Sequence, residues 1–418
     1  MAIPFIHLAD VHLGRLSGAG LTGAQLKQRR VDALEALRRS LEYARTHKVP
    51  LVLIAGDLFE HAVVPRSTVL EVRDLLGALS PAQVFIAAGN HDFGAADSFY
   101  RTLPWPDNVH LFLGNWETVE VPDLPVTVVG LGFHAPEVTE PHLRALRLEE
   151  RDEGHYRVVL LHGEMINGGM TMGAPKGSAT EAPGGAAAGP GSRYLPVTEA
   201  DIRECGADYI AMGHIHRPLV RWAGDLAWGD GCRVGEGGYG EGKSEEKRLV
   251  KAAYAGALEP LDFGDQGEHG FYHGELTGGG ARLVFVPAAC RSFHTVTLDI
   301  SGCETTAGVL EKMAEALKPI KDGDLVRLIF TGEVEPHSEW DRPRLLALGQ
   351  RFFSFQTIDL TVPAYDLKEL AKGYSARAAF VRRLLARLEE AAAEDRIILQ
   401  RALRLGLDAL SGREVKVE

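Results

Sequence analysis

Five short polar motifs in this sequence contain residue types that bind metal ions, and each motif follows a run of apolar residues. The motifs are Asp10-Val11-His12, Gly56-Asp57, Gly89-Asn90-His91-Asp92, His162-Gly163 and Gly213-His214-Ile215-His216. Short apolar runs that end in a polar turn are typical of strands buried on both faces of a sheet. In open α/β folds, sites collect at the carboxyl ends of such strands, so we expect all five motifs to meet at one sheet edge.

The mixture of side chains in these motifs indicates which chemistry the edge supports. Carboxylates, an amide oxygen and imidazole nitrogens suit divalent ions such as Mn²⁺, Fe²⁺ or Zn²⁺. Two ions roughly 3.5–4 Å apart need a shared ligand, which a carboxylate provides best, and Asp57 is the candidate bridge. Such ions lower the pKa of a bound water and offset the charge of a phosphodiester. The motifs therefore predict a dinuclear, metal-dependent phosphodiesterase.

Each motif taken alone has a simpler structural explanation. Asp-x-His and Gly-Asp sequences are common in turns, and a single histidine after a strand is more often a hydrogen-bonded core residue than a ligand. The combination favours the metal site, because the motifs occur in order, each at an expected strand end, and use five of the 16 histidines. The other histidines have no such surroundings, and we interpret them as structural or surface residues.

The composition limits the classes of protein to which the chain can belong. A length of 418 residues predicts two or three domains. No apolar run approaches the roughly 20 residues that cross a bilayer, and Met1–Leu8 lacks a basic signal-peptide start, so we expect a cytoplasmic protein without membrane attachment. Four cysteines without CxxC spacing agree with a reducing compartment. The net charge of −12 gives no support to a free-standing nucleic-acid binder, although bound ions or a partner can supply positive charge.

Alternating strand and helix patterns predict the fold of the first part of the chain. Helical patterns at about 25–47 and 67–79 separate the apolar runs 3–8, 51–55 and 84–88. This β-α-β-α-β order predicts a mainly parallel sheet with helices packed on it. We therefore expect an α/β (α+β layered) core, a β-sheet flanked by helices, over residues 1–263.

A change of composition near residues 264–280 indicates a domain boundary. Beyond it, alternating strands and helices predict a smaller α+β capping domain over 264–370. Residues 371–418 have an amphipathic helical pattern, and these helices either pack on their own domain or dock a partner. Two glycine-rich insertions stand apart: 163–191 is expected to be a lid or a disordered loop, and 224–246 a surface excursion.

The ordered motif set resembles the calcineurin-like metallophosphoesterase superfamily. Within it, the fuller forms DVHLG (Asp10–Gly14), GDLFE (Gly56 followed by Asp57–Glu60) and GHIH resemble SbcD-type DNA repair exonucleases, including the YhaO branch. The resemblance covers residues 3–216, extends to about 263 through Tyr254–Leu261, and is much looser in the C-terminal part. It implies the metallophosphoesterase fold, two divalent ions with Mn²⁺ as the usual one, and a nuclease activity.

The resemblance also implies a role for individual residues. One ion would be held by Asp10, His12, Asp57 and His216. The other would be held by Asp57, Asn90, His162 and His214. His91 would not be a ligand but would contact the phosphate and protonate the leaving oxygen.

Glu60 is a departure from the family pattern, since relatives tend to have Asp or His three residues after the bridging aspartate. We hypothesise that Glu60 accepts a hydrogen bond from His91 and keeps it protonated, because a neighbouring carboxylate raises the pKa of an imidazole. The alternative is a solvated loop residue. Asp92 is expected to support the turn or the ligands. Candidates for contact with DNA phosphates, chosen for their closeness to the motifs, are Arg15, Lys27, Arg29, Arg30 and Arg217.

The expected function is hydrolysis of DNA, as a 3′→5′ exonuclease with single-strand endonuclease activity in double-strand-break repair. By resemblance alone, the protein would work as a homodimer with an SMC-like coiled-coil ATPase of the SbcC/YhaN type. One alternative is a phosphodiesterase of cyclic nucleotides or nucleotides, for which the C-terminal domain and helices would have little use. Another is an assembly subunit of an ATPase complex with an inactive site, against which the full set of ligand positions argues.

Overall fold

The computed structural model describes residues 2–15, 20–148, 153–167, 170–171, 192–224, 228–233, 249–335, 340–390 and 393–412. These fall into two compact units. The first comprises Met1–Thr295, Lys321–Val326 and Phe352–Ser354, and the second comprises Val296–Ile320, Arg327–Arg351 and Phe355–Glu418. No described helix combines the length and the apolar composition that crossing a bilayer requires.

One large sheet forms the centre of the first unit, and it consists of two parallel halves. The first half contains β1 (Ile3–Leu8), β2 (Leu51–Ala55), β3 (Gln83–Ala87) and β4 (Val109–Phe112). The second half contains β6 (Val126–Leu131), β7 (Tyr156–His162), β11 (Tyr209–Gly213) and β14 (Val250–Tyr254), with β5 (Glu117–Glu120) antiparallel at its edge. The predicted parallel sheet is therefore confirmed, and it is extended by a second half.

An antiparallel hairpin joins the two halves. It consists of β15 (Gly270–Thr277), which pairs with β1, and β16 (Gly280–Pro287), which pairs with β14. The sheet order is β4-β3-β2-β1-β15-β16-β14-β11-β7-β6-β5. The expected boundary at 263/264 is therefore about thirty residues too early. The glycine-rich composition near 264–280 belongs to a loop and a tight hairpin turn of the core sheet, not to a linker between domains.

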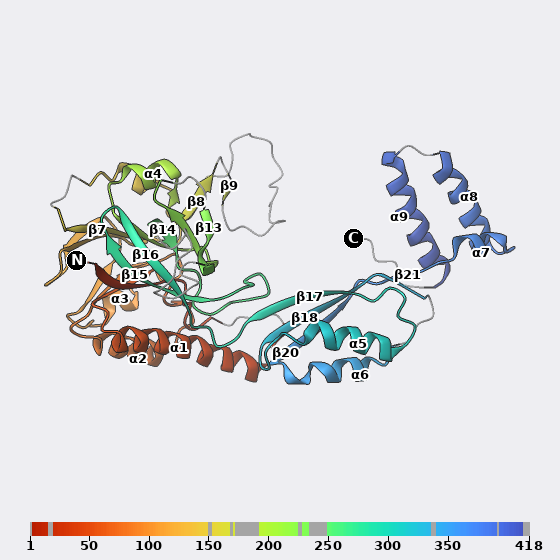
Figure 1. The fold of residues 1–418 in the computed structure, drawn as a ribbon, viewed down its shortest axis with the longest axis horizontal. Coiled ribbons are helices and arrows are strands. Elements are labelled where there is room, and N and C mark those ends of the chain that lie inside the picture. The colour runs from red at the N-terminus through yellow and green to blue at the C-terminus, as the bar shows by residue number, and fades with distance from the viewer. Residues whose placement is uncertain are drawn as a thin grey trace, which may run out of the picture. The chain divides into compact units, whose positions relative to one another are not determined.

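Helices and short strands cover the sheet of the first unit. Figure 1 shows α1 and α2 on one side of the strands and α4 on the other. The remaining bounds are α1 (Gly23–Thr46), α2 (Arg66–Gly77), α3 (Phe99–Thr102), η1 (His142–Ala145), α4 (Glu199–Glu204), η2 (Gly231–Arg233), β8 (Glu164–Asn167), β9 (Met170–Thr171), β10 (Pro196–Val197), β12 (Leu219–Trp222) and β13 (Trp228–Asp230).

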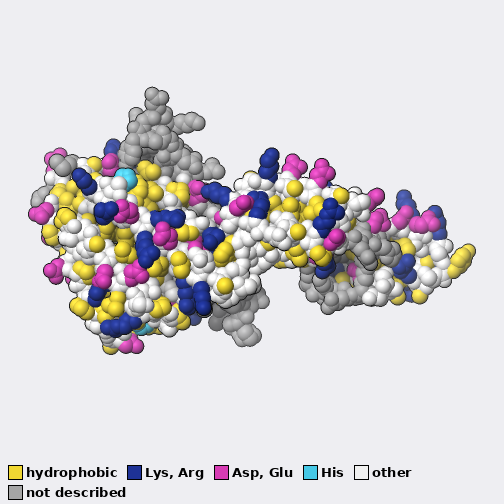
Figure 2. Space-filling view, turned by 90° about the horizontal axis from the view of Figure 1, so that it is seen from below, with side chains coloured by type: hydrophobic (Ala, Val, Ile, Leu, Met, Phe, Trp, Pro, Cys, Tyr) yellow, Lys and Arg dark blue, Asp and Glu magenta, His cyan; other side chains and the backbone are white. Residues whose placement is uncertain are grey.

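Local contacts explain where α1 begins, and its outer face is charged. Thr22 caps the helix by accepting a hydrogen bond from the Gln25 main chain, and the Gln25 side chain accepts one from the Thr22 main chain. The outer face carries charge pairs such as Arg38 with Glu71. On the side of the first unit seen in Figure 2, Lys and Arg side chains are interspersed with Asp and Glu. That face therefore presents no uniform basic patch.

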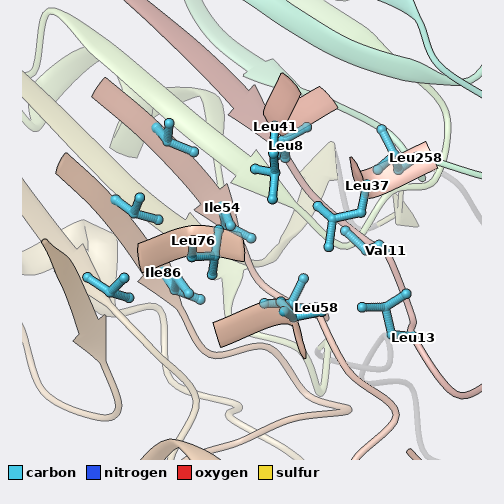
Figure 3. Packing of buried hydrophobic residues seen from close by; sticks show 14 of the residues in the cluster. Leu8, Val11, Leu13, Leu37, Leu41, Ile54, Leu58, Leu76, Ile86 and Leu258 are labelled. Atoms are coloured by element: carbon cyan, nitrogen blue, oxygen red, sulfur yellow. The ribbon is translucent and has the colours of Figure 1, made fainter. Parts of the chain in front are cut away.

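The central strands of the first unit, such as β2, β6 and β11, are buried on both faces, as the apolar runs predicted for the strands before the motifs. Along β2, Val52 and Ile54 pack toward α1 and α2, whereas Leu51 and Leu53 pack toward the second half of the sheet. Figure 3 shows the helix-side cluster, in which Leu37 of α1 and Leu76 of α2 contact the side chains of the first strands. A rigid core of this kind fixes the positions of the strand ends, and therefore of the motifs that follow them.

The second unit is a small α+β structure with helices at its C-terminal end. A three-stranded sheet, most of whose residues belong to this unit, has the order β17-β18-β20, and β19 pairs in parallel with β21. The element bounds are β17 (Phe293–Asp299), α5 (Thr306–Leu317), β18 (Leu325–Thr331), β19 (Glu333–Val334), α6 (Arg342–Ala347), η3 (Leu348–Arg351), β20 (Ser354–Asp359), β21 (Val362–Pro363), α7 (Leu367–Lys372), α8 (Ala376–Glu390) and α9 (Ala393–Leu410). Helices α8 and α9 pack against each other through Val381, Leu384, Leu403 and Leu407.

Two of the sequence expectations fall largely outside the described residues. The expected lid over 163–191 is described only at 163–167 and 170–171, and the excursion over 224–246 only at 224 and 228–233.

Candidate metal centre

Five strands of the first unit end at the five motifs, three in the first half of the sheet (β1, β2 and β3) and two in the second (β7 and β11). Within each half these strands are parallel, and contacts between the halves bring their carboxyl ends together at one edge: Nδ1 of His162 contacts the Ala55 carbonyl, and the His214 N–H donates to Asp10. The chain turns sharply at this edge. Asp10, His12 and Asp57 have φ values of 50°, 50° and 52°, and His214 has a φ of 104°. Left-handed backbone at non-glycine residues is strained, and it is found where side chains are held for function.

Two motif glycines are required by the closeness of the ligands. A Cβ on Gly89 would lie 2.1 Å from Oδ1 of Asp57, and a Cβ on Gly56 would lie 2.4 Å from Nδ1 of His162. Any larger residue would displace a side chain of the site. This contact explains why glycine precedes the polar residues in both motifs.

Asp10, His12 and His216 form one group whose ligand atoms all lie within 4.8 Å of one another. The main-chain N–H of His214 donates to both carboxylate oxygens of Asp10, at 3.0 Å each. Nδ1 of His12 donates to Oε1 of Glu60 at 2.9 Å. Its Nε2 is buried without a hydrogen-bond partner among the described residues and lies 3.6 Å from Oδ2 of Asp57. An orphaned imidazole lone pair beside two carboxylates fits a metal ligand.

Asp10, Asp57 and His162 form the second group, with Asn90 beside it. Nδ1 of His162 donates to the Ala55 carbonyl at 2.9 Å, while Nε2 lies 3.0 Å from Oδ1 of Asn90 and 3.5 Å from Oδ2 of Asp57. A neutral imidazole carries one N–H, so with Nδ1 donating, Nε2 presents a lone pair to two oxygen acceptors. Three acceptor atoms converge on one point, and a cation at that point satisfies all three.

The electrostatics of the buried groups agree with bound cations. Burial raises the pKa of Asp10 to about 6. Burial and the neighbouring carboxylates of Asp92 and Asp10 raise the pKa of Asp57 well above its usual range. Burial lowers the pKa of His12 to about 3 and that of His214 to about 4, so both imidazoles are neutral and able to coordinate at neutral pH. Divalent ions would stabilise the two carboxylates in their charged form.

Asp57 is placed to bridge two ions. Its Oδ2 lies 3.6 Å from Nε2 of His12 and 3.5 Å from Nε2 of His162, so one oxygen faces both groups. Its Oδ1 accepts a hydrogen bond of 2.9 Å from the His91 main chain. The His214 side chain is less tightly grouped than the other predicted ligands, and its ring packs against that of His162 with centroids 5.2 Å apart.

Glu60 contacts both His91 and His12. Its Oε2 lies 3.0 Å from Nδ1 of His91 and its Oε1 lies 2.9 Å from Nδ1 of His12, and its side chain is 15% exposed. Burial alone would raise the pKa of Glu60, but the hydrogen bonds from the two imidazoles lower it below its usual range. The structure thus brings together the hypothesised pair of Glu60 and His91. The His12 contact was not anticipated from the sequence.

Asp92 connects two of the motif loops, as its expected supporting role requires. It is buried, and its carboxylate accepts hydrogen bonds from the main chain of Leu58, Phe59 and Gly89 and from the hydroxyl of Tyr100. These four bonds fix the loop after β2 against the loop after β3.

The arginines chosen as phosphate contacts differ in their surroundings. Arg15 is partly exposed and lies 3.6 Å from Glu60, and Arg217 is exposed and lies 3.8 Å from Asp230. Lys27 is exposed and Arg30 is half-buried. Arg29 is a correction, because it is buried, with its guanidinium bonded to Glu259 and to the Pro260 carbonyl. Arg29 therefore ties α1 to the chain after β14 and does not face a ligand.

Asp265 belongs to the site although no motif or spacing in the sequence points to it. Its Oδ2 lies 3.2 Å from Nδ1 of His216. A position 49 residues from its partner, in a turn-like Asp-Phe-Gly-Asp stretch, carries no local signal for this contact. Only the folding of that loop against the β11 motif reveals it.

The fold and the site define a metal-dependent phosphoesterase with a dinuclear centre. The chain belongs to the calcineurin-like phosphoesterase family, whose model matches residues 3–218. Members of this family bind two divalent metal ions, which agrees with the two groups of ligands described above. The resemblance inferred from the motifs is confirmed.

Individual relatives narrow the comparison. The chain is 22% identical over 346 residues to the metallophosphoesterase YhaO of Bacillus subtilis, covering 79% of this chain and 72% of that protein. It is 28% identical over 235 residues to the DNA double-strand break repair protein Mre11 of Aeropyrum pernix, and 24% identical over 301 residues to the Mre11 of Methanopyrus kandleri. These two alignments cover 52% and 66% of this chain but only 49% and 54% of the relatives, so the chain spans about half of each.

Proposed function

We propose that the protein hydrolyses DNA phosphodiester bonds with two divalent ions, Mn²⁺ being the expected one. It would act as a 3′→5′ exonuclease with single-strand endonuclease activity in double-strand-break repair. One observation supports the hydrolytic part most strongly. The Nε2 atoms of His12 and His162 both face Oδ2 of Asp57, and Nε2 of His162 also faces Oδ1 of Asn90, so that acceptor atoms meet where cations would bind. The choice of DNA is supported by the similarity to Mre11 proteins that are named for break repair.

Each of the assembled side chains has a role in this proposal. Asp10, His12, Asp57 and His216 would hold one ion, and Asp57, Asn90, His162 and His214 the other. When bound, the ions supply a hydroxide from water and neutralise charge on the phosphate. The shared Oδ2 of Asp57 keeps the two pockets at a fixed spacing, while burial of the ligands limits competition from solvent.

His91 is the proposed proton donor to the leaving oxygen. Its side chain is 38% exposed, unlike the fully buried His12 and His162, so it can reach a substrate. Its main-chain N–H is fixed by Asp57, and its Nδ1 contacts Glu60, which leaves Nε2 free to face the scissile bond. Glu60 would keep this ring oriented.

The remaining parts of the proposal concern partners. Arg15, Lys27, Arg30 and Arg217 are the proposed contacts for the DNA backbone. Helices α8 and α9 form a hairpin with its own apolar core, which we propose as the docking element for an SMC-like coiled-coil ATPase. A homodimer and a cytoplasmic location complete the proposal.

Hydrolysis by the purified protein with Mn²⁺ tests the function. End-labelled duplex DNA, single-stranded DNA, cyclic nucleotides and a generic diester are compared, using wild type, His91→Ala and the matched control His142→Ala. His142 lies on η1 away from the motifs. We expect ladders from DNA that decrease about 10²- to 10⁴-fold in His91→Ala and persist in His142→Ala.

Two results would contradict the DNA proposal. Turnover of the small diesters with DNA left intact would indicate a small-molecule phosphodiesterase, which the net charge of −12 and the mixed charges in Figure 2 make a fair competitor. Capture of an ATPase without metal-dependent hydrolysis of any diester would indicate an assembly subunit.

A further inference from the structure

The histidines of the two ion pockets are oriented by different kinds of acceptor. His12 and His216, in the first pocket, each direct Nδ1 at a carboxylate, Glu60 at 2.9 Å and Asp265 at 3.2 Å. In the second pocket, His162 directs Nδ1 at the neutral carbonyl of Ala55 at 2.9 Å. The ring of His214 packs on the ring of Tyr194, with centroids 4.8 Å apart. The first pocket is therefore backed by two carboxylates in direct contact with Nδ1 atoms, whereas Nδ1 of His162 contacts a neutral carbonyl and has its nearest carboxylate, that of the ligand Asp10, 4.0 Å away.

A carboxylate behind a ligating imidazole strengthens the metal site. It fixes the tautomer, orients the ring and makes the coordinating nitrogen more basic, and loss of such a partner typically lowers metal affinity about 10- to 100-fold. A neutral carbonyl fixes the tautomer too, but it adds no net charge. The difference predicts unequal affinities for two ions that otherwise share Asp57.

The Asp265 carboxylate is held in place before any ion binds. Its Oδ2 also accepts a hydrogen bond from the Leu261 main chain at 3.0 Å, and its main-chain carbonyl lies 3.1 Å from Nε2 of the buried His269. Nδ1 of His269 contacts the Ala257 carbonyl at 2.9 Å. The loop is therefore anchored to the chain that follows β14, and the Asp265 side chain is only 18% exposed.

Glu60 reaches His12 because the chains that follow β1 and β2 run side by side. The Leu13 N–H donates to the Leu58 carbonyl at 3.0 Å, and the Glu60 N–H donates to the Leu13 carbonyl at 2.9 Å. This ladder continues the pairing of the two strands into the motif loops. It sets Oε1 of Glu60 opposite Nδ1 of His12 while Oε2 contacts His91.

We propose that the pocket of Asp10, His12, Asp57 and His216 binds the tighter of the two ions and fills first, and that Glu60 and Asp265 are positioning residues that set this order. The proposal rests on the two-ion site assigned above, and not on DNA as the substrate. Asp265 is the cleaner residue for a test, because its carboxylate contacts His216 but not His91.

Titration of metal-free protein with Mn²⁺, without substrate, tests the proposal. Free Mn²⁺ is followed by electron paramagnetic resonance in wild type, Asp265→Asn, Glu60→Gln, His162→Gln and the matched control Asp262→Asn. Asp262 lies in the same loop, and its side chain bonds to the Gly264 N–H. We expect two binding steps in wild type. Asp265→Asn and Glu60→Gln should weaken the tighter step about 10- to 100-fold.

The other variants identify which step belongs to which pocket. His162→Gln should remove the weaker step and leave the tighter one, and Asp262→Asn should change neither. Imidazole ¹⁵N shifts of metal-free protein add an independent measure, since His216 should lose its preference for Nδ1–H in Asp265→Asn but not in Asp262→Asn. If Asp265→Asn does not fold, as thermal unfolding of the metal-free protein would reveal, Glu60→Gln carries the same expectation for the tighter step.

Several outcomes would overturn the proposal. These are two equal steps in wild type, equal weakening of both steps in Asp265→Asn, no change in that variant, or loss of the tighter step in His162→Gln. Because no substrate is present, ordered Mn²⁺ binding without DNA cleavage would refute only the proposed nuclease. Cleavage of DNA with unordered binding would refute only the order of ion binding.

Discussion

The metal-bearing edge of the first unit and the helices of the second unit differ in how well each residue suits its local structure. At the edge, Asp10, His12 and Asp57 have positive φ, and buried carboxylates and imidazoles face one another. In the second unit, helices begin with ordinary caps: Thr305 accepts from the Gly308 N–H, and Asp366 accepts from the Glu369 N–H. Positive φ also occurs away from this edge, at Lys48, Asp123 and Leu195, but at the edge it coincides with buried side chains of ligand type that face one another, and this combination is typical of a functional site.

Replacing the bridge should give the largest effect. Asp57→Asn removes the charge that both ions share, so we expect hydrolysis of any diester to fall by at least about a thousandfold. The fold should survive, because a neutral side chain relieves the burial of a carboxylate whose pKa is already raised. Activity is measured with saturating Mn²⁺, and circular dichroism checks the fold. Activity within tenfold of wild type would show that Asp57 is not the shared ligand on which hydrolysis depends.

Acid should destabilise the first unit before the second. Burial lowers the pKa of His7, which contacts the Tyr209 hydroxyl, from its usual 6.5 to about 3. The unfolded chain then binds a proton that the folded chain excludes, so stability is lost as pH falls from about 6.5 toward 3. For His7 alone this loss is about 3 kcal/mol between pH 7 and pH 4.

Denaturant unfolding at the two pH values measures this loss in wild type and in His7→Gln. The variant should be less sensitive to pH by about that amount. The described residues of the second unit contain no histidine, so hydrogen exchange there should change less over the same range. Equal acid sensitivity of wild type and variant would show that His7 is not the responsible group.

A pair of glycine substitutions compares the two regions directly. Gly89→Ala places a Cβ 2.1 Å from Oδ1 of Asp57, and we expect a loss of about 1–3 kcal/mol in stability together with reduced hydrolysis. Gly308→Ala, within α5, meets only the Thr305 hydroxyl at 3.7 Å and should stabilise the protein by about 0.5–1 kcal/mol. Thermal unfolding and Mn²⁺-dependent hydrolysis are measured for both. A neutral Gly89→Ala would mean that the loop after β3 is looser than described.

Loss of a helix cap in the second unit should have the smallest effect. Asp366→Ala removes the hydrogen bond to the Glu369 N–H at the start of α7, which typically costs about 1 kcal/mol. Hydrolysis of a generic diester should remain unchanged, since the substitution lies outside the first unit. Denaturant unfolding and steady-state kinetics measure the two quantities. A large fall in kcat would show that the division between a functional edge and an ordinary second unit is too simple.

The features that could be predicted from the sequence are those whose signal is local. An apolar run that ends in Gly-Asp or Gly-Asn-His-Asp indicates both a buried strand and the metal ligand that follows it. The metal-bearing edge, the parallel strands and the flanking helices could therefore be predicted from the sequence. Pairing across long separations was not. The β15–β16 hairpin lies in the core sheet because β1 and β14 accept it, and its glycines look like a linker when taken alone.

The same limit explains the errors and omissions at the site. Arg29 was a reasonable phosphate contact from its place near a motif, but the fold buries it against Glu259, 230 residues away. Asp265 and the second contact of Glu60 were missed because hydrogen-bond partners of a ligand leave no spacing pattern. The metal ligands at the strand ends can be identified from the motifs, whereas the residues that orient these ligands can be identified only from tertiary contacts.

A crystal structure of the protein grown with Mn²⁺, with the ions located by anomalous scattering, tests the central claim most directly. We expect two ions on either side of Oδ2 of Asp57, one bound by Asp10, His12 and His216 and the other by Asn90, His162 and His214. A single ion, or two ions that do not share Asp57, would contradict it.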